Sequence, residues 1–217
     1  DAVVVGAGAV GLACAYALSQ RGLSVIVLEA EAHIGQGVSS RNSEVIHGGL
    51  YYPTGSLKAR LCVQGRRRLY AFLDKHHVAY DKCGKLVVAS NETEVARIDA
   101  IYEQAVINGV EGMQRLSGDE ARGLEPQLGA VAALLSPQSG VFDSHGYMVA
   151  LQGEIEAAGG AVVLSTPFEG ATPLEDGGFE VRAGGAEPTK ITTGRLVIAA
   201  ALDAQTCAAA IDGSVTF

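Results

Sequence analysis

The stretch that decides the fold is Val3-Val4-Val5-Gly6-Ala7-Gly8-Ala9-Val10-Gly11. The three valines predict a buried strand, and residues 12–20, after the glycine-spaced turn, predict a helix. Beyond a turn at Gly22, residues 25–28 predict a second buried strand that ends in Glu29. This order is typical of a βαβ unit with two parallel strands and a glycine fingerprint in its first turn.

Each glycine of the fingerprint has a geometric reason. Gly6 permits the tight turn, Gly8 leaves room for a phosphate beside the backbone, and Gly11 lets the helix pack closely on the sheet. Hydrogen bonds from the helix N-terminus to an anion are worth about 1.5–3 kcal/mol each, more than the roughly 0.3–1 kcal/mol of the helix dipole. The carboxylate of Glu29 can accept hydrogen bonds from ribose hydroxyls, and it repels a 2′-phosphate. The motif therefore predicts binding of a dinucleotide other than NADP.

Composition and charge narrow the class of protein. Apolar residues make up 48% of the 217 residues, which is enough for a sizeable core in one or two domains. The net charge of −8 argues against nucleic acid as a partner. No apolar run approaches the roughly 20 residues of a transmembrane segment, although peripheral contact with a membrane stays open.

The four cysteines bear on metal binding and on the cellular compartment. Cys14, Cys62, Cys83 and Cys207 show neither CxxC nor zinc-ligand spacing, so no metal site is predicted. We expect reduced and mostly packed thiols, which favours a cytoplasmic location.

A polar, glycine-rich loop follows Glu29 and is too long for a simple connection, which indicates a functional segment. Its second half reads Ser39-Ser40-Arg41-Asn42-Ser43-Glu44-Val45-Ile46-His47-Gly48-Gly49-Leu50-Tyr51-Tyr52-Pro53. Hydroxyl and amide side chains at 39, 40 and 42 can hydrogen-bond a polyol, and Arg41 can offset the charge of a pyrophosphate. Two plainer interpretations stay open: helix N-caps for the serines and a surface ion pair for Arg41.

The glycine fingerprint, Glu29, Gly35 and the run at 39–53 together resemble the D-amino-acid-oxidase-like FAD oxidoreductases. Within that family, residues 41–65 are similar to the L-2-hydroxyglutarate dehydrogenase/oxidase group, and the likeness extends through 84–89 and 140–145. The resemblance implies an α/β fold: a Rossmann-like FAD-binding domain, with a parallel sheet and a β-meander, and an inserted α+β substrate domain. Members of the group continue well beyond residue 217, so the chain resembles an N-terminal portion.

The resemblance also implies domain boundaries. Residues 1–83 and 139–217 are expected in the FAD-binding domain, and residues 84–138, which show their own helix and strand pattern, in the first part of the substrate domain. Residues 56–76 predict an amphipathic helix capped by Ser56. The apolar residues expected mostly on one side of it are Leu57, Leu61, Val63, Leu69, Phe72 and Leu73. The run at 66–68 is expected to be a solvated face of this helix, with an acid-binding patch as the alternative.

Cofactor contacts follow from the resemblance rather than from spacing. Residues 39–42 are expected near the pyrophosphate and ribityl chain. His47 and Gly48 are expected beside the isoalloxazine, and Val162 beside the adenine. The expected cofactor residues are Gly6, Gly8, Gly11, Glu29, Ser39, Ser40, Arg41, Asn42, His47, Gly48, Val162 and Ala200. Relatives usually have glycine where this chain has Ala201, so a Cβ is added where close approach to the cofactor is expected.

The predicted activity is oxidation of a small 2-hydroxy acid, with a hydride passing to flavin N5. His47 is the candidate base because its type titrates near neutral pH, although a flavin-packing histidine is an equal alternative. Tyr51 or Tyr52 is a candidate donor to the substrate carboxylate, with core packing as the alternative, and Lys58 and Arg60 can meet substrate carboxylates or FAD phosphates.

Two other functions stay open. One is an FAD-dependent amine or amino-acid oxidase of the glycine or sarcosine type, and the other is a flavin-binding module without turnover. The sequence leaves the electron acceptor open among oxygen, a quinone and a carrier protein.

Overall fold

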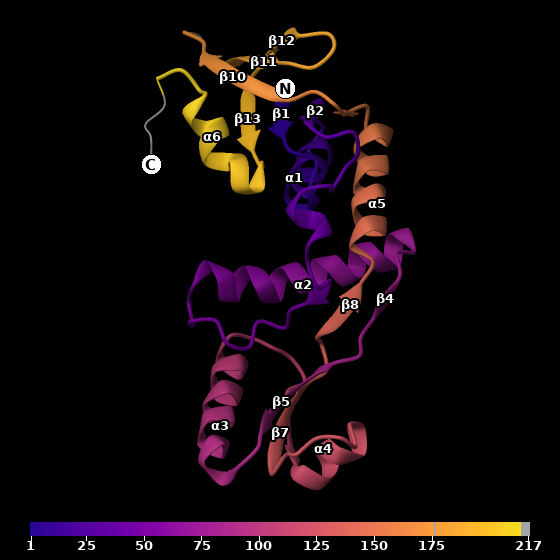
Figure 1. Cartoon of the computed structure of the whole chain (residues 1–217), viewed down its shortest axis with the longest axis vertical. Coiled ribbons are helices and arrows are strands. Elements are labelled where there is room, and N and C mark those ends of the chain that lie inside the picture. The colour runs from indigo at the N-terminus through magenta and orange to yellow at the C-terminus, as the bar shows by residue number, and fades with distance from the viewer. Residues whose placement is uncertain (176, 214–217) are drawn as a thin grey trace. The chain divides into compact units, whose positions relative to one another are not determined.

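The computed structural model describes residues 1–175 and 177–213, which divide into two compact units (Figure 1). Unit 1 comprises Asp1–Asn42 and Ser144–Phe217, and unit 2 comprises Ser43–Asp143. Residues 43–83 and 139–143, expected in the FAD-binding domain, lie in unit 2 of this division. Which part holds cofactor and which holds substrate stays a prediction.

Unit 1 is built on a parallel sheet of four strands in the order β13-β1-β2-β9. The strands are β1 (Ala2–Val5), β2 (Val25–Leu28), β9 (Ala161–Val163) and β13 (Arg195–Ile198). In the central register Val4 lies opposite Val27 and Val197. The valines of β1 are buried, so the predicted parallel βαβ unit is confirmed.

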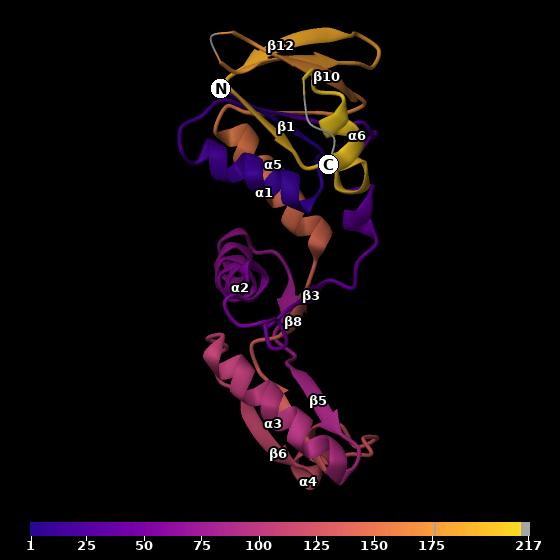
Figure 2. The same cartoon turned by 90° about the vertical axis from the view of Figure 1, so that its left-hand side faces the viewer.

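The two faces of this sheet carry different layers (Figure 2). Helices α1 (Ala9–Ser19) and α5 (Ser144–Ala157) pack together on one face. The other face meets the predicted meander, through a core in which Val3 and Leu28 contact Ala171 and Val181. The meander strands and the final helix are β10 (Phe168–Pro173), β11 (Phe179–Ala183), β12 (Thr189–Thr193) and α6 (Ala204–Ala209).

Two boundaries in unit 1 differ from expectation. Helix α1 begins at Ala9 rather than Leu12, because Gly8, in extended conformation, already serves as its N-cap. Residues 195–201 predict a last buried strand, but β13 ends at Ile198 and none of its residues is fully buried; Ala201 takes a φ of +48° and opens the 3₁₀ turn η2 (Ala201–Asp203).

Unit 2 contains the long helix α2 (Leu57–His76) and two antiparallel sheets. The larger sheet has the order β5-β7-β6, and the smaller β3-β8-β4. The remaining elements are β3 (Val45–Ile46), β4 (Tyr80–Asp81), β5 (Lys85–Ala89), α3 (Glu92–Ile107), β6 (Gln114–Ser117), α4 (Gly118–Leu124), β7 (Ala132–Ser136) and β8 (Gly140–Phe142).

Side-chain caps start the helices of unit 2. Ser56 Oγ accepts a hydrogen bond from Ala59 N at 3.2 Å, which confirms the predicted start of α2. Ser117 and Glu120 form a reciprocal capping box at α4. These local interactions explain why the helix starts were predictable from sequence.

The apolar face of α2 was predicted correctly at Val63 and Leu73 and wrongly at Leu57 and Leu61. Its buried side chains include Val63, Arg66 and Leu73, whereas Leu57 and Leu61 are exposed. Arg66 takes the place of an apolar residue in the buried row because Glu111 forms an ion pair with its guanidinium. The expectation of a solvated face therefore fails at Arg66.

Two further expectations concern thiols and membranes. The four cysteines are free; Cys83 is exposed and the others are half-buried, so they are less packed than predicted. Within residues 1–175 and 177–213, no helix is both long and apolar enough to cross a bilayer.

Candidate functional site

The glycine turn of unit 1 shows why its glycines are required. Gly6 has a φ of +100°, and a Cβ there would lie 2.7 Å from Ala199 O. A Cβ on Gly11 would lie 1.9 Å from Gly6 O. The turn, the first turn of α1 and the end of β13 therefore approach one another more closely than any side chain allows.

The start of α1 is suited to an anion. Its N-cap, Gly8, has no side-chain cap, and the first turn contains no acidic residue. Ser39 Oγ accepts a hydrogen bond from Ala9 N at 3.0 Å, and a Cβ on Gly8 would lie 2.9 Å from the same oxygen. Backbone donors, a hydroxyl and a glycine are thus gathered at the positive end of the helix.

Glu29 lies at the carboxyl end of β2, beside the glycine turn. Its Oε2 accepts from Ala7 N at 2.6 Å and its Oε1 from Glu31 N at 2.9 Å. Each carboxylate oxygen has a further lone pair available for a ribose hydroxyl. Val162 lies opposite Val27 in the neighbouring strand, so its backbone ends at the same edge of the sheet, where ligands of α/β folds bind.

The residues after Ser39 form a short turn, η1 (Val38–Ser40). Ser40 Oγ donates to Gly37 O at 2.9 Å, so it does not cap a helix. The guanidinium of Arg41 reaches Ser40 Oγ at 3.1 Å, and the part of the chain that the structure describes contains no carboxylate paired with Arg41. Asn42 Nδ2 donates to Ser39 O at 2.6 Å, which ties the amide to the turn at α1.

Ala200 lies directly against the glycine turn. Its Cα would be 3.4 Å from a Cβ on Gly6. Ala201 follows with the left-handed φ that normally favours glycine, at the position where relatives are expected to have glycine. The backbone therefore keeps the glycine conformation although the residue is alanine.

In unit 2, His47 follows directly after β3 on a loop that lies along α2. Its carbonyl accepts a hydrogen bond from Cys62 Sγ at 3.3 Å. Gly49 has a φ of +98°, and a Cβ there would lie 3.0 Å from Val63 Cγ2. A Cβ on Gly48 would lie 2.6 Å from Leu50 Cδ1, so both glycines are needed for packing inside this unit.

The electrostatics around His47 favour its neutral form. Burial lowers the pKa of the imidazole, and the positive charges of Lys85 and Lys58 lower it further. Burial raises the pKa of the Cys62 thiol against the opposing charges of Arg66, Lys58 and Lys85, which keeps the thiol protonated as a donor to His47 O. A neutral imidazole is the form that accepts a proton.

Two tyrosines and two lysines complete this cluster. Lys58 Nζ lies 4.5 Å from the ring centroid of Tyr52, and Lys85 Nζ lies 5.8 Å from that of Tyr51. Tyr51 is exposed rather than packed in the core, and burial raises the pKa of both phenols, so they remain donors at neutral pH. Lys85, on β5, was not anticipated at this site, because it is distant in sequence and only the packing of unit 2 brings it there.

Comparison with known proteins assigns the family. A model of the family "FAD dependent oxidoreductase" (DAO) matches residues 1–215. The chain belongs to the DAO family of FAD-dependent oxidoreductases. This confirms the predicted family and makes FAD the cofactor.

Curated relatives of this DAO-family chain are named L-2-hydroxyglutarate dehydrogenase, mitochondrial. The Arabidopsis thaliana protein is 48% identical over 151 residues, which are 70% of this chain and 31% of that protein. The Caenorhabditis elegans protein is 38% identical over 96% of this chain and 49% of its own length. The chain thus spans about a third to a half of the length of the curated relatives it matches.

Solved structures share the fold. An L-α-glycerophosphate oxidase from Mycoplasma pneumoniae with FAD bound is 27% identical and superposes with a TM-score of 0.78, covering 91% of this chain and 52% of that one. An L-proline dehydrogenase from P. horikoshii, at 22% identity, has a TM-score of 0.84 over 97% of this chain and 55% of that one. The predicted fold class is confirmed.

The donor set of unit 1 fits FAD. The glycine turn, the free N-terminus of α1 and Ser39 can hold a pyrophosphate, and Glu29 can hold a ribose. The expected cofactor residues at 39–42, Val162 and Ala200 lie in unit 1, and the expected His47, Gly48, Tyr51 and Tyr52 lie in unit 2. Their individual contacts with FAD stay predictions.

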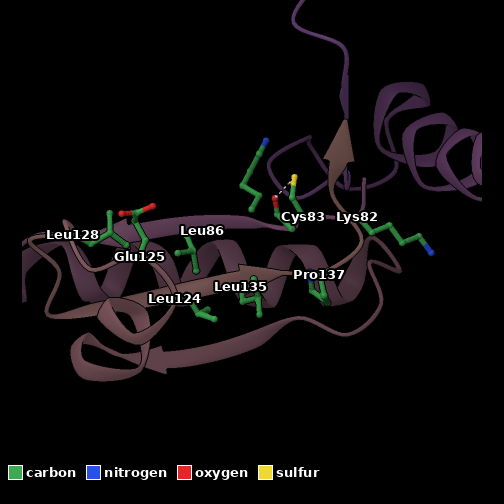
Figure 3. A pocket seen from close by; sticks show the side chains of 10 residues that line it. Lys82, Cys83, Leu86, Leu124, Glu125, Leu128, Leu135 and Pro137 are labelled. Carbon is green, nitrogen blue, oxygen red and sulfur yellow. Dashed lines mark hydrogen bonds between the residues drawn. The ribbon is translucent and has the colours of Figure 1, made fainter. Parts of the chain in front are cut away.

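A cavity of about 540 Å³ opens elsewhere in unit 2, between the start of β5, α4 and β7 (Figure 3). Leu86, Leu124 and Leu135 line it, and Cys83, at one end, donates to the Gly84 carbonyl. It includes Lys85 but neither His47 nor the tyrosines, so it is not the His47 cluster. Among the described residues, no group of three or more His, Cys, Asp or Glu side chains is arranged to hold a metal ion.

Proposed function

We propose that the protein oxidises a small 2-hydroxy acid of the L-2-hydroxyglutarate type with FAD as the oxidant. The observation that carries this proposal is the cluster in unit 2, where the charges of Lys58 and Lys85 act on His47 and each ammonium group lies over a tyrosine ring. A base for the hydroxyl and donors for a carboxylate are what a 2-hydroxy acid requires. The names of the curated relatives support the same substrate type.

The residues of the chain have distinct tasks in this reaction. Bound FAD supplies the hydride acceptor. The N-terminus of α1 and Ser39 hold the pyrophosphate, and Glu29 holds a ribose. In unit 2, His47 takes the proton of the substrate hydroxyl as the C2–H bond breaks, a role that typically contributes about 10²–10⁴-fold to the rate. Tyr51 and Tyr52 donate to the substrate carboxylate.

The test is an anaerobic titration of the purified full-length protein, followed through its flavin absorption. We expect L-2-hydroxyglutarate to bleach the flavin and glycine and sarcosine to leave it unchanged. Bleaching by glycine or sarcosine alone would assign the protein to the amine oxidases. A bound flavin that none of these compounds reduces would favour a binding module without turnover.

Electron acceptor and location complete the proposal. The reduced flavin can pass electrons to oxygen, a quinone or a carrier protein, and reoxidation rates with each would distinguish them. The cytoplasmic location stays a prediction, whereas the curated relatives are named as mitochondrial. Cell fractionation of the full-length protein decides between the two compartments.

A further inference from the structure

Two lysines near His47 have no acidic partner. Lys58 lies in the first turn of α2, and Lys85 is the first residue of β5. Across residues 1–175 and 177–213, the ion pairs of the structure include neither of them. Acidic residues outnumber basic ones by 24 to 16 in this chain, so two neighbouring cations without a carboxylate are not a consequence of composition. The surplus positive charge is local to the His47 cluster.

The two ammonium groups are held in place by neutral groups. Each lies over a tyrosine ring, Lys58 over Tyr52 and Lys85 over Tyr51, and a ring face attracts a cation without neutralising it. The Tyr52 carbonyl accepts hydrogen bonds from Gln104 Nε2 at 2.8 Å and from Asn108 Nδ2 at 2.9 Å, so α3 anchors that ring.

The second cation is anchored by a different element. Lys85 lies opposite Ser136 in the pairing of β5 with β7. Two cations from separate elements, one from a helix and one from a strand, thus lie over the rings of adjacent tyrosines, and both act on the charge of His47. Both remain available to bind an anion from outside the chain.

We propose that Lys58 and Lys85 bind the two carboxylates of a dicarboxylic 2-hydroxy acid and thereby select it over a monocarboxylic acid of equal length. This inference rests on the proposed function and adds the residues that set its specificity. A single carboxylate needs one ammonium group and the phenols, whereas two cations from separate elements match a ligand with a charge at each end.

The same arrangement couples substrate binding to the base. Both lysines lower the pKa of His47. The Cys62 thiol donates to the His47 carbonyl, and Arg66 acts on that thiol together with the two lysines. A bound dicarboxylate offsets both positive charges. Binding of the dicarboxylate should therefore raise the pKa of His47, so that the imidazole accepts the hydroxyl proton of the bound substrate more readily.

Glutarate is the probe that tests binding separately from oxidation, because it has both carboxylates and no hydroxyl group. Its dissociation constant from the full-length holoprotein is compared with that of pentanoate, for Lys58→Met, Lys85→Met and the wild type. We expect both variants to bind glutarate about 10–100-fold more weakly, whereas pentanoate, with one carboxylate, should lose affinity in at most one of them. The KM for L-2-hydroxyglutarate should rise in both variants, while the KM for L-2-hydroxypentanoate should rise in at most one.

Lys82→Met is the matched control, since Lys82 also lies over a tyrosine, 4.2 Å from the Tyr70 ring centroid, but not in the His47 cluster. It should leave glutarate affinity unchanged. Lys85→Arg keeps the charge and should retain glutarate binding, which separates loss of charge from loss of folding.

Several results would overturn the inference. The first is unchanged glutarate affinity in both methionine variants, and the second is an equal loss of affinity for glutarate and pentanoate in both variants. The third is weaker FAD binding with glutarate affinity unaffected, which would assign the lysines to FAD phosphates. If glutarate binds through the lysines but L-2-hydroxyglutarate does not reduce the flavin, the proposed function fails and the dicarboxylate site stands. If L-2-hydroxyglutarate reduces the flavin but neither lysine variant changes glutarate affinity, the proposed function stands and the dicarboxylate site fails.

Discussion

The two units offer different kinds of groups to their expected ligands, backbone in unit 1 and side chains in unit 2. Unit 1 does so mainly with backbone: Gly6 and Gly11 permit contacts that any Cβ would block, and the helix N-terminus presents N–H groups. Unit 2 does so with titratable side chains, among them His47, Lys58 and Lys85. Substitutions in unit 1 should therefore act through added volume, whereas those in unit 2 should act through lost charge or lost proton transfer.

The largest effect is expected at His47. Replacing His47 with Gln should slow anaerobic flavin reduction by about 10²–10⁴-fold, because the base is lost. The affinity for FAD should not change. His33→Gln, at an exposed position of unit 1, is the control and should reduce at the wild-type rate. Wild-type reduction by the His47 variant would assign the imidazole to flavin packing instead.

The second largest effect is expected at the glycine turn. Gly11→Ala places a methyl group against Gly6 O and should weaken FAD binding on the order of 100-fold, because the backbone donors move from their anion. Gly153→Ala, in α5 of the same unit, meets nothing within 4 Å and should bind FAD normally. Fluorescence titration with FAD measures both variants. Equal affinities would contradict the steric explanation.

The buried ion pair of unit 2 should come next. Glu111→Gln should lower the free energy of unfolding by about 1–3 kcal/mol, because the guanidinium of Arg66 is left without a compensating charge. Glu103→Gln breaks the exposed pair with Arg115 and should cost less than about 1 kcal/mol. Chemical denaturation compares the two variants, and equal costs would show that burial of Arg66 has no energetic consequence.

This ion pair also predicts a dependence on acid. Burial would raise the pKa of Glu111, but hydrogen bonds from Arg66 and Arg67 more than offset it, so the folded-state pKa is lowered. A lowered carboxyl pKa contributes stability above the unfolded pKa, which is lost as pH falls through the folded value. Stability of the wild type should therefore fall more steeply in acid than that of Glu111→Gln.

A smaller effect is expected in the dependence of kcat/KM on pH. Because the lysines lower the pKa of His47, the neutral base should persist to lower pH than for an ordinary histidine. Lys58→Met removes one of these charges, so the acid limb of kcat/KM should move to higher pH. Profiles of both proteins on the same substrate measure the shift. A limb that stays in place would remove Lys58 from the electrostatics of the base.

The smallest effect is expected at Ala201. A left-handed φ costs a residue with a Cβ about 1–2 kcal/mol, and glycine returns about 0.5–1 kcal/mol of that as unfolded-chain freedom. Ala201→Gly should therefore stabilise the protein by only about 0.5 kcal/mol. Ala208→Gly, inside α6, should destabilise it by about 1 kcal/mol. Thermal unfolding distinguishes the two, and a destabilised Ala201→Gly would contradict the inferred strain.

Much of the fold was predictable because its determinants are local. Buried valine runs, glycine spacing and capping residues such as Ser56 act within a few positions, and the corresponding elements were found. Arg66 was not, because its burial depends on Glu111, which lies far along the chain. The electrostatic effect of Lys85 on His47 likewise depends on the packing of β5 against the loop that carries His47, which is distant in sequence. His47, Tyr51, Tyr52 and Lys58 were predicted from the sequence and its family likeness, whereas Lys85 was found only in the structure.

The most direct measurement is the rate of anaerobic flavin reduction in the full-length protein by L-2-hydroxyglutarate carrying hydrogen or deuterium at C2. If the flavin takes the C2 hydride while His47 takes the hydroxyl proton, the deuterated acid should reduce it several-fold more slowly. Equal rates for the two acids, or a bound flavin that neither reduces, would contradict the proposed chemistry.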